Sequence, residues 1–196
     1  NGKLYGLGSN DAGASLVSLF QVYRHLSMTT QSYNLIFLAS CEEEVSGKNG
    51  IESVLPQLPP IALGVVGEPT EMQPAIAEKG LMVLDVTARG KSGHAARNEG
   101  ENAIYKLLPD IEWFRTYKFP KESPILGPVK MSVTQINAGT QHNVIPDLCS
   151  IVVDIRSNEC YSNEELFAEI CQHIQSEAKA RSFRLNSSSI PSDRIT

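Results

Sequence analysis

The amino-acid sequence predicts an α/β protein in two parts: a partial parallel-sheet domain, then a smaller domain with the β-α-β-β-α-β order of a ferredoxin-like fold. Two observations predict this class. In the first third of the chain, an amphipathic helical stripe alternates with short, fully apolar runs, the pattern of strands buried on both faces of a parallel sheet. From about residue 75 apolar residues alternate with polar ones instead, which is typical of strands with one open face.

The first part contains two expected helices and two expected strands. Residues 14–26 have apolar side chains at helical spacing, and residues 50–55 form a shorter helical segment that Pro56 stops. The apolar runs 34–39 and 61–66 are the expected strands. Two strands are too few to bury a sheet, so we expect the remaining strands of this domain to lie outside the sequence.

The second part contains four expected strands, at residues 81–88, 129–136, 150–156 and 182–186, and two expected helices, at residues 102–117 and 163–180. Ser162 or Asn163 is the expected N-cap of the second helix, with Glu164 and Glu165 in its first turn. Residues 187–196 are rich in Ser and contain one Pro, and we expect them to form a linker.

Composition excludes several functional classes. The net charge is −5, with 17 basic against 22 acidic residues, which argues against binding to nucleic acid or to an anionic membrane surface. No apolar stretch approaches the roughly 20 residues that a membrane span needs. No signal peptide is evident, although a chain that starts at Asn1 could have lost one. The four cysteines form no CxxC pair, so we expect reduced thiols in a cytoplasmic protein.

Acidic residues stand at three positions of the first part that we interpret as strand ends: Asp11 follows the segment Tyr5 to Asn10, and the run Glu42 to Glu44 and Glu68 follow the two expected strands. The carboxyl ends of parallel strands meet at one edge of a sheet, so these side chains are expected to converge. Like charges are costly to bring together unless a cation neutralises them, which predicts a metal site. Taken singly, a glutamate run is more often a solvated turn, and one acidic residue after a strand is more often a helix cap.

Five ordered motifs resemble those of one enzyme family: Tyr5 to Asp11, Cys41 to Glu44, Val66 to Thr70, Gly90 to His94, and Gly139 to Pro146. It is the family of two-zinc amidohydrolases that contains acetylornithine deacetylase, succinyl-diaminopimelate desuccinylase, aminoacylase and glutamate carboxypeptidase. The resemblance runs over nearly the whole chain and is nearest to the acetylornithine deacetylase branch. It implies a metal-binding domain over residues 1–75, a lid and dimerisation domain over 76–186, and a linker over 187–196.

The resemblance also implies roles for the acidic residues. Asp11 resembles the carboxylate that bridges two zinc ions, with Co or Mn as possible substitutes for zinc, and the peptide after it is expected to be cis. Glu43 resembles the general base, Glu44 a ligand of one metal, and Glu68 a ligand of the other. The run of three glutamates leaves a second register open, with Glu42 as the base and Glu43 as the ligand.

In the expected lid, the resemblance implies a trans-acting group and a substrate clamp. His94 resembles a histidine that polarises the scissile carbonyl in the partner subunit of a homodimer, and Asn143 resembles a residue of the same group. Arg156 resembles a clamp for the substrate carboxylate, a task that suits a bidentate guanidinium. The alternative for His94 is a surface residue or helix cap, and for Arg156 an exposed arginine at a strand end.

Two histidine ligands that the family uses, one before Asp11 and one far downstream, have no counterpart here. His25 and His173 lie in expected helices and are expected to be structural. We therefore expect the sequence to be an incomplete copy, about half of such an enzyme.

The implied reaction is hydrolysis of the amide bond of an N-acyl amino acid, first of all N-acetylornithine to ornithine and acetate, a step of arginine biosynthesis. N-acetylcitrulline, N-succinylcitrulline and succinyl-diaminopimelate are the alternatives. Two other classes remain: a non-catalytic dimerisation module, and a nucleotide-binding module suggested by Gly6-Leu7-Gly8. The second is weak, because Asp11 stands where the third glycine of that motif belongs.

Overall fold

The computed structural model describes residues 2–45 and 47–189. The chain divides into two compact units, Asn1–Pro74 and Ala75–Thr196, each of which is described by itself. Among the described residues, no helix combines the length and the apolar character needed to cross a membrane. All four cysteines are free thiols.

The first unit contains helix α1 (Gly13–Ser27), helix α2 (Ile51–Val54) and the 3-10 turn η1 (Leu55–Gln57), in agreement with the two predicted helices. The peptide between Asp11 and Ala12 is cis, as the family resemblance implied. Phe37 packs against the rings of Phe20 and Tyr23 on α1, with centroids 5.3 and 5.8 Å apart.

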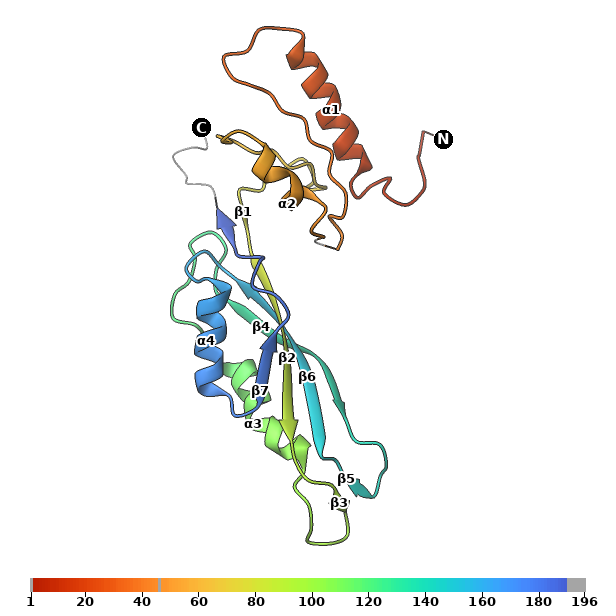
Figure 1. Cartoon of the computed structure of the whole chain (residues 1–196), viewed down its shortest axis with the longest axis vertical. Coiled ribbons are helices and arrows are strands. Elements are labelled where there is room, and N and C mark those ends of the chain that lie inside the picture. Colours follow the sequence, from red (N-terminus) through yellow and green to blue (C-terminus); the bar gives the residue numbers. More distant parts are fainter. Residues whose placement is uncertain (1, 46, 190–196) are drawn as a thin grey trace. The chain divides into compact units, whose positions relative to one another are not determined.

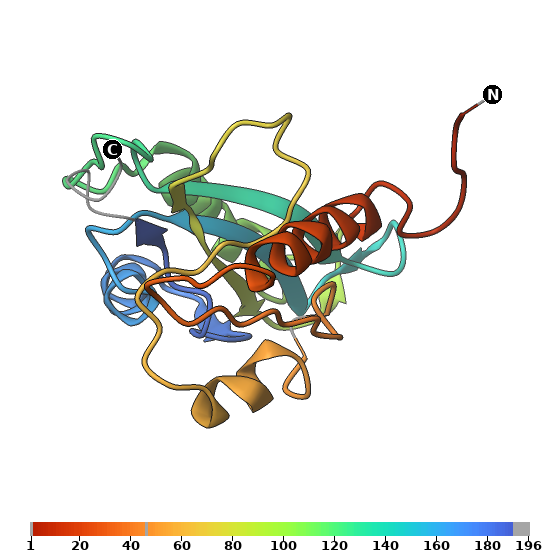
Figure 2. The ribbon, with the colours of Figure 1, turned by 90° about the horizontal axis from the view of Figure 1, so that it is seen from above.

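The prediction of two strands in this unit is wrong for the described part of the chain. Residues 34–39 and 61–66 have no strand assignment, and no arrow appears in the red-to-gold part of the ribbon (Figures 1 and 2). Apolar side chains on both runs are exposed, among them Ile36 at 51% and Leu63 at 72%. A strand is defined by a hydrogen-bonded neighbour, and within the described residues of this unit neither run has one.

The second unit is built on a four-stranded antiparallel sheet with the order β4-β6-β2-β7 (Figure 1). Its strands are β2 (Gly80–Arg89), β4 (Lys130–Ala138), β6 (Leu148–Ser157) and β7 (Glu177–Ala180). Helix α3 (Ala103–Thr116) follows β2, and helix α4 (Asn163–His173) follows β6. Along the chain, the elements of this layer therefore occur in the order β-α-β-β-α-β.

The two helices pack on one face of the sheet, and alternation along the strands separates the core from the open face. Met82, Leu84 and Val86 of β2 are fully buried together with Leu107 of α3 and Leu166 of α4. The residues between them on β2 are only half-buried and belong to the opposite face. The second unit thus has one covered and one open sheet face.

The end of the second unit differs from the prediction. Helix α4 begins with the predicted Ser162 cap, whose hydroxyl accepts the Glu165 amide at 3.1 Å, but it ends at His173 instead of residue 180. Buried Asp110 on α3 accepts the amides of Gln175 and Ser176, both at 3.0 Å. These bonds hold the chain in a turn, so that residues 177–180 pair with β2 as β7.

The strand predicted at 182–186 is also absent, apart from a single antiparallel bridge between Leu185 and Leu81 of β2. Beyond it, β8 (Ser188–Ser189) pairs with β1 (Ala77–Glu78). Residues 190–196, most of the predicted linker, lie outside the described part of the chain.

Candidate metal and substrate site

Asp11 lies in a tight turn directly before α1. The Ser9 amide donates to the Gly6 carbonyl at 3.2 Å, and the Gly13 amide donates to the Gly8 carbonyl at 2.8 Å. A Cβ atom on Gly13 would lie only 2.6 Å from that Gly8 oxygen, so glycine is needed where the helix begins. The Asp11 side chain itself is exposed.

The three glutamates differ in what they contact. The Glu42 carboxylate accepts the Asn49 amide and the Asn49 side-chain nitrogen, both at 3.1 Å. Its carbonyl also accepts the Gly47 amide at 3.0 Å. All three glutamates are exposed, but among the described residues only Glu42 is held in its own loop by side-chain hydrogen bonds.

Glu68 follows a glycine that lies against α1. A Cβ atom on Gly67 would be 2.7 Å from a methyl carbon of Leu19 and 3.1 Å from the Cβ of Ser15. The segment that carries Glu68 thus runs along the helix that Asp11 precedes.

The described residues contain no group of three or more His, Cys, Asp or Glu side chains that could hold a metal ion. Carboxylates are suitable zinc donors, but this part of the chain does not bring Asp11, Glu44 and Glu68 together as a metal centre. The arrangement of the described residues therefore does not fit the two zinc ions that the motifs imply.

In the second unit, the structure does bring two predicted residues together. Short strands β3 (Gly93–His94) and β5 (Val144–Ile145) pair antiparallel, with His94 opposite Val144. The Ala95 amide donates to the Asn143 carbonyl at 3.0 Å. His94 and Asn143, far apart in the sequence, are thus neighbours in one small ribbon, and His94 is exposed.

The loop that carries His94 is tightly held. The His94 amide donates to the Glu99 carboxylate at 3.1 Å, and the ring atom Nδ1 accepts the Ala96 amide at 3.2 Å. At the base of the loop, Gly100 has a φ of +86° and leaves 2.7 Å between a hypothetical Cβ and the Lys91 carbonyl. The loop therefore holds both the backbone and the ring of His94.

Arg156 lies at the other end of the sheet. Its Nε and Nη2 atoms donate to the two carboxylate oxygens of Asp154, at 2.8 and 3.2 Å. Leu148, at the His94 end of β6, is eight residues away along the strand, or about 26 Å at a rise of about 3.3 Å per residue. Sequence reasoning missed Asp154, although alternation alone places residues 154 and 156 on the same face.

Of the two helical histidines, His173 makes structural contacts, whereas His25 on α1 is exposed. His173 stacks on Trp113 at 5.2 Å with an interplanar angle of 20°, and its Nδ1 lies 2.9 Å from the Glu169 carbonyl. It belongs to the contact between α3 and α4.

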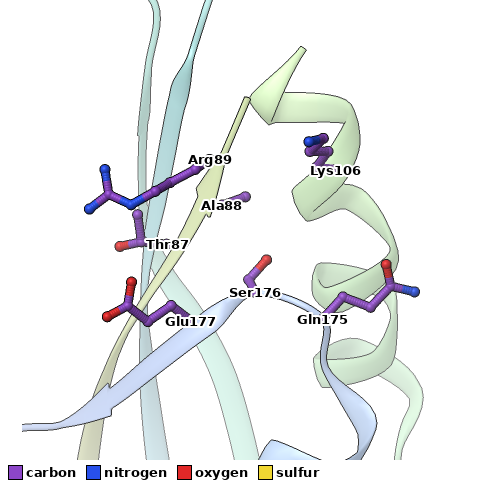
Figure 3. A pocket seen from close by; sticks show the side chains of 7 residues that line it. All are labelled: Thr87, Ala88, Arg89, Lys106, Gln175, Ser176 and Glu177. Carbon is purple, nitrogen blue, oxygen red and sulfur yellow. The ribbon is translucent and has the colours of Figure 1, made fainter. Parts of the chain in front are cut away.

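The second unit also has a shallow hollow. It is lined by Thr87, Ala88, Arg89, Lys106, Gln175, Ser176 and Glu177. Figure 3 shows that Arg89 and Lys106 point in different directions from it, so their charges do not converge on one ligand position. None of the sequence-predicted site residues lines it.

Comparisons with known proteins assign most of the second unit to a family. Residues 76–182 match the model of the M20 family described as the peptidase dimerisation domain. The chain is 30% identical over 164 residues to an acetylornithine deacetylase from Proteus mirabilis, covering 79% of this chain and 42% of that protein. It is also 30% identical over 165 residues to a succinyl-diaminopimelate desuccinylase from Corynebacterium glutamicum, covering 80% and 44%. The chain thus spans less than half the length of these relatives.

Among solved structures, an M20 family metallo-carboxypeptidase from Sulfolobus solfataricus has a TM-score of 0.44 and 13% identity, over 58% of this chain and 45% of that one.

Proposed function

The chain belongs to the peptidase dimerisation domain family of M20 proteins, and on that premise we propose that the protein that contains it is a metal-dependent amidohydrolase acting on N-acyl amino acids. N-acetylornithine is the proposed substrate, with ornithine and acetate as products. N-acetylcitrulline, N-succinylcitrulline and succinyl-diaminopimelate are the alternatives. The names of the two relatives support this substrate class. Four free thiols are compatible with the proposed cytoplasmic location.

We assign residues 1–75 to the metal-binding domain and 76–186 to a lid and dimerisation domain with ferredoxin-like topology. The strand order β4-β6-β2-β7, with both helices on one face, supports the second assignment. Zinc is the proposed cofactor, with Asp11, Glu44 and Glu68 as ligands, on the resemblance of their motifs alone.

The proposed proton carrier is Glu43. It would take a proton from the attacking water and return it to the leaving amine. The hydrogen bonds from Asn49 engage the Glu42 carboxylate, and among the described residues Glu43 and Glu44 have no such bonds, which supports Glu43 and Glu44 as the working pair. Arg156 would bind the substrate carboxylate, and His94 would stabilise the oxygen of the acyl carbonyl.

The observation that carries this proposal is the separation of the lid residues. His94 and Asn143 lie beyond one end of the sheet, and Arg156 lies about 26 Å along β6 toward the other end. A single N-acyl amino acid is much shorter than this distance. One lid therefore cannot place all three side chains on one substrate, and a homodimer in which His94 and Asn143 serve the partner's site resolves the conflict.

An unpaired sheet edge is available for such a dimer. In the strand order, β4 is at one margin of the sheet and β2 is central. β4 is nine residues long and mostly exposed, with Ile136 at 56%. A long edge of this kind is suited to pairing with a second copy.

The test is complementation between two variants of the full-length protein. His94→Ala and Glu43→Ala homodimers should each be nearly inactive. A mixed dimer contains one site with intact Glu43, served by the intact His94 of its partner, so activity should return toward half of the wild-type value per mixed dimer. Confirmed subunit exchange without any return of activity would refute the role of His94 in trans. If the full-length wild-type protein hydrolyses none of the named substrates, the alternative function, a non-catalytic dimerisation module, would be favoured.

A further inference from the structure

Two positively charged residues, Lys130 and Arg156, are neighbours in one row of residues across the open face of the sheet in the second unit. Lys130 on β4 is directly opposite Arg156 on β6, and Leu81 on β2 is opposite Arg156 from the other side. Directly opposite residues project from the same face of an antiparallel sheet. Ile155, next to Arg156, is fully buried under the helices, so this row lies on the open face.

The pairing of Lys130 with Arg156 is unfavourable in the absence of an anion. Opposite residues have Cβ atoms about 4.5–5.5 Å apart, and like charges at this separation destabilise a sheet. Both carboxylate oxygens of Asp154 are engaged by Arg156, and no ion pair of Lys130 occurs among the described residues. The three charged groups together carry a net charge of +1.

A second ion pair on the same face shows the ordinary arrangement. Arg181 grips Asp85 through Nε and Nη2 at 2.9 and 2.8 Å. In this second pair, however, the lysine directly opposite on the neighbouring strand, Lys179 of β7, is paired with Asp85 and not with Arg181. The cross-strand charges are of opposite sign, and both cations lower the pKa of Asp85, Arg181 most strongly through its hydrogen bond.

The geometry of Arg156 leaves a usable fork of donors. A guanidinium has five N–H groups, and Asp154 accepts from Nε and from one hydrogen of Nη2. Both hydrogens of Nη1 and the other hydrogen of Nη2 remain, and one hydrogen from each of these nitrogens forms the end-on fork that fits a planar carboxylate. Lys130 adds an ammonium on the same face. The Arg156 and Asp154 side chains are 47% and 29% exposed, so a ligand has access.

We propose that Lys130 and Arg156 together bind one carboxylate group, and that Asp154 is a positioning residue that turns the free fork of Arg156 toward it. One carboxylate brings the charge of the cluster to zero. The proposal rests on the function proposed above, under which this group is the α-carboxylate of the N-acyl amino acid. Lys130 is then a specificity residue: it favours free amino-acid ends over amidated or peptide-bonded ones.

The kinetic experiment uses the full-length protein with N-acetylornithine and its neutral α-carboxamide. Lys130→Ala should raise KM for the carboxylate about tenfold with kcat nearly unchanged, because binding common to ground and transition states is lost. KM for the carboxamide should change little, and Lys130→Arg should restore most of the loss. Asp154→Asn should also raise KM for the carboxylate selectively. Arg181→Gln, which breaks the ion pair between Arg181 and Asp85 of β2, should change neither KM value. Equal effects of Lys130→Ala on both substrates would overturn the proposal.

A binding experiment separates this proposal from the proposed function. The 196-residue chain is titrated with sodium acetate and with neutral acetamide while backbone amide resonances are followed by NMR. We expect acetate-specific shifts at Lys130, Arg156 and Leu81 that Lys130→Ala removes, whether or not the full-length protein hydrolyses any substrate. If acetate and acetamide give the same shifts at these positions, there is no carboxylate site here, even if the enzyme proves active.

Discussion

Replacement of Asn163 by aspartate tests how the second unit is held together at the start of α4. Asn163 is fully buried. Its side-chain nitrogen lies 2.9 Å from the Leu185 carbonyl, 3.3 Å from that of Phe183 and 3.4 Å from that of Leu81. Its side-chain oxygen accepts the Ser157 hydroxyl at 3.0 Å. One amide therefore joins β2, β6, α4 and the chain after β7.

Asn163→Asp keeps the size of the side chain and reverses its chemistry. A carboxylate oxygen would face three carbonyl oxygens in place of a donor. The amide nitrogen has two hydrogens, so two hydrogen bonds are lost, at about 1 kcal/mol each. In addition, a buried charge is left without a cation, which costs about 3–5 kcal/mol in comparable cases. The two terms overlap, and we expect a loss of about 4 kcal/mol at pH 7. That is a large share of the roughly 5–15 kcal/mol that stabilises a typical domain.

Urea unfolding followed by tryptophan fluorescence measures this loss. Trp113 is the only tryptophan of the chain and stacks on Tyr117 at 4.5 Å, so the signal reports on the second unit. If the free energy of unfolding falls by about 2 kcal/mol per molar urea, the urea concentration at the unfolding midpoint should fall by about 2 M. Burial raises the pKa of the introduced carboxyl, so the penalty is full at neutral pH and shrinks as pH falls toward the unfolded value of about 4.

Asn102→Asp is the matched control. Asn102 caps α3, and its side-chain oxygen accepts the Ile104 amide at 2.9 Å. A carboxylate is at least as good a cap and interacts favourably with the helix dipole, so the same substitution should be neutral or slightly stabilising there. A loss below about 1 kcal/mol for Asn163→Asp, or equal losses at both positions, would refute the reasoning.

Two further predictions concern α3 and α4. The Tyr117 hydroxyl donates to Glu169, which raises the pKa of the tyrosine to about 12. Glu169→Gln should move this titration toward 10, as measured by the difference in phenolate absorbance between the two proteins. Because the folded pKa lies above the unfolded value, the bond contributes stability below about pH 10 and loses it as pH rises toward 12. Asp110→Ala should destabilise the second unit by about 2–4 kcal/mol in the same urea experiment, since two amides lose their acceptor. The exposed Glu112→Gln should have no measurable effect, and equal unfolding curves for both would contradict the role of Asp110.

Much of the second unit could be predicted from the sequence, because burial of one sheet face appears directly in the pattern of apolar and polar residues. A sheet covered on one face produces strict alternation, and the alternating segments at 81–88 and 150–156 lie within β2 and β6. The errors lay at the end of the unit, where the strand predicted at 182–186 is absent and residues 177–180, predicted as helix, form β7. The Glu-Ala-Lys-Ala sequence of residues 177–180 favours a helix, but the Asp110 bonds to the preceding turn and pairing with β2 prevail.

The first unit shows the limit of such reasoning. An apolar run such as 61–66 has the composition of a buried strand, but strand formation depends on a partner elsewhere in the chain. For the site, the motifs predicted that His94 and Asn143 act together, and the fold does bring these two residues close to each other. The grip of Asp154 on Arg156 and the cation opposite it depend on strand register, which composition does not reveal.

The hydrogen bond from the Ala96 amide to His94 has a consequence for which ring nitrogen carries the proton. An atom that accepts an N–H bond must present its lone pair, so Nδ1 is unprotonated while this bond is intact. In the neutral imidazole the hydrogen is then on Nε2. The loop thus selects one tautomer, and the ring directs an N–H donor outward, toward whatever oxygen approaches it. With this tautomer fixed, His94 is prepared to donate a hydrogen bond to a carbonyl, but Nε2 has no lone pair with which to bind a metal or accept a proton.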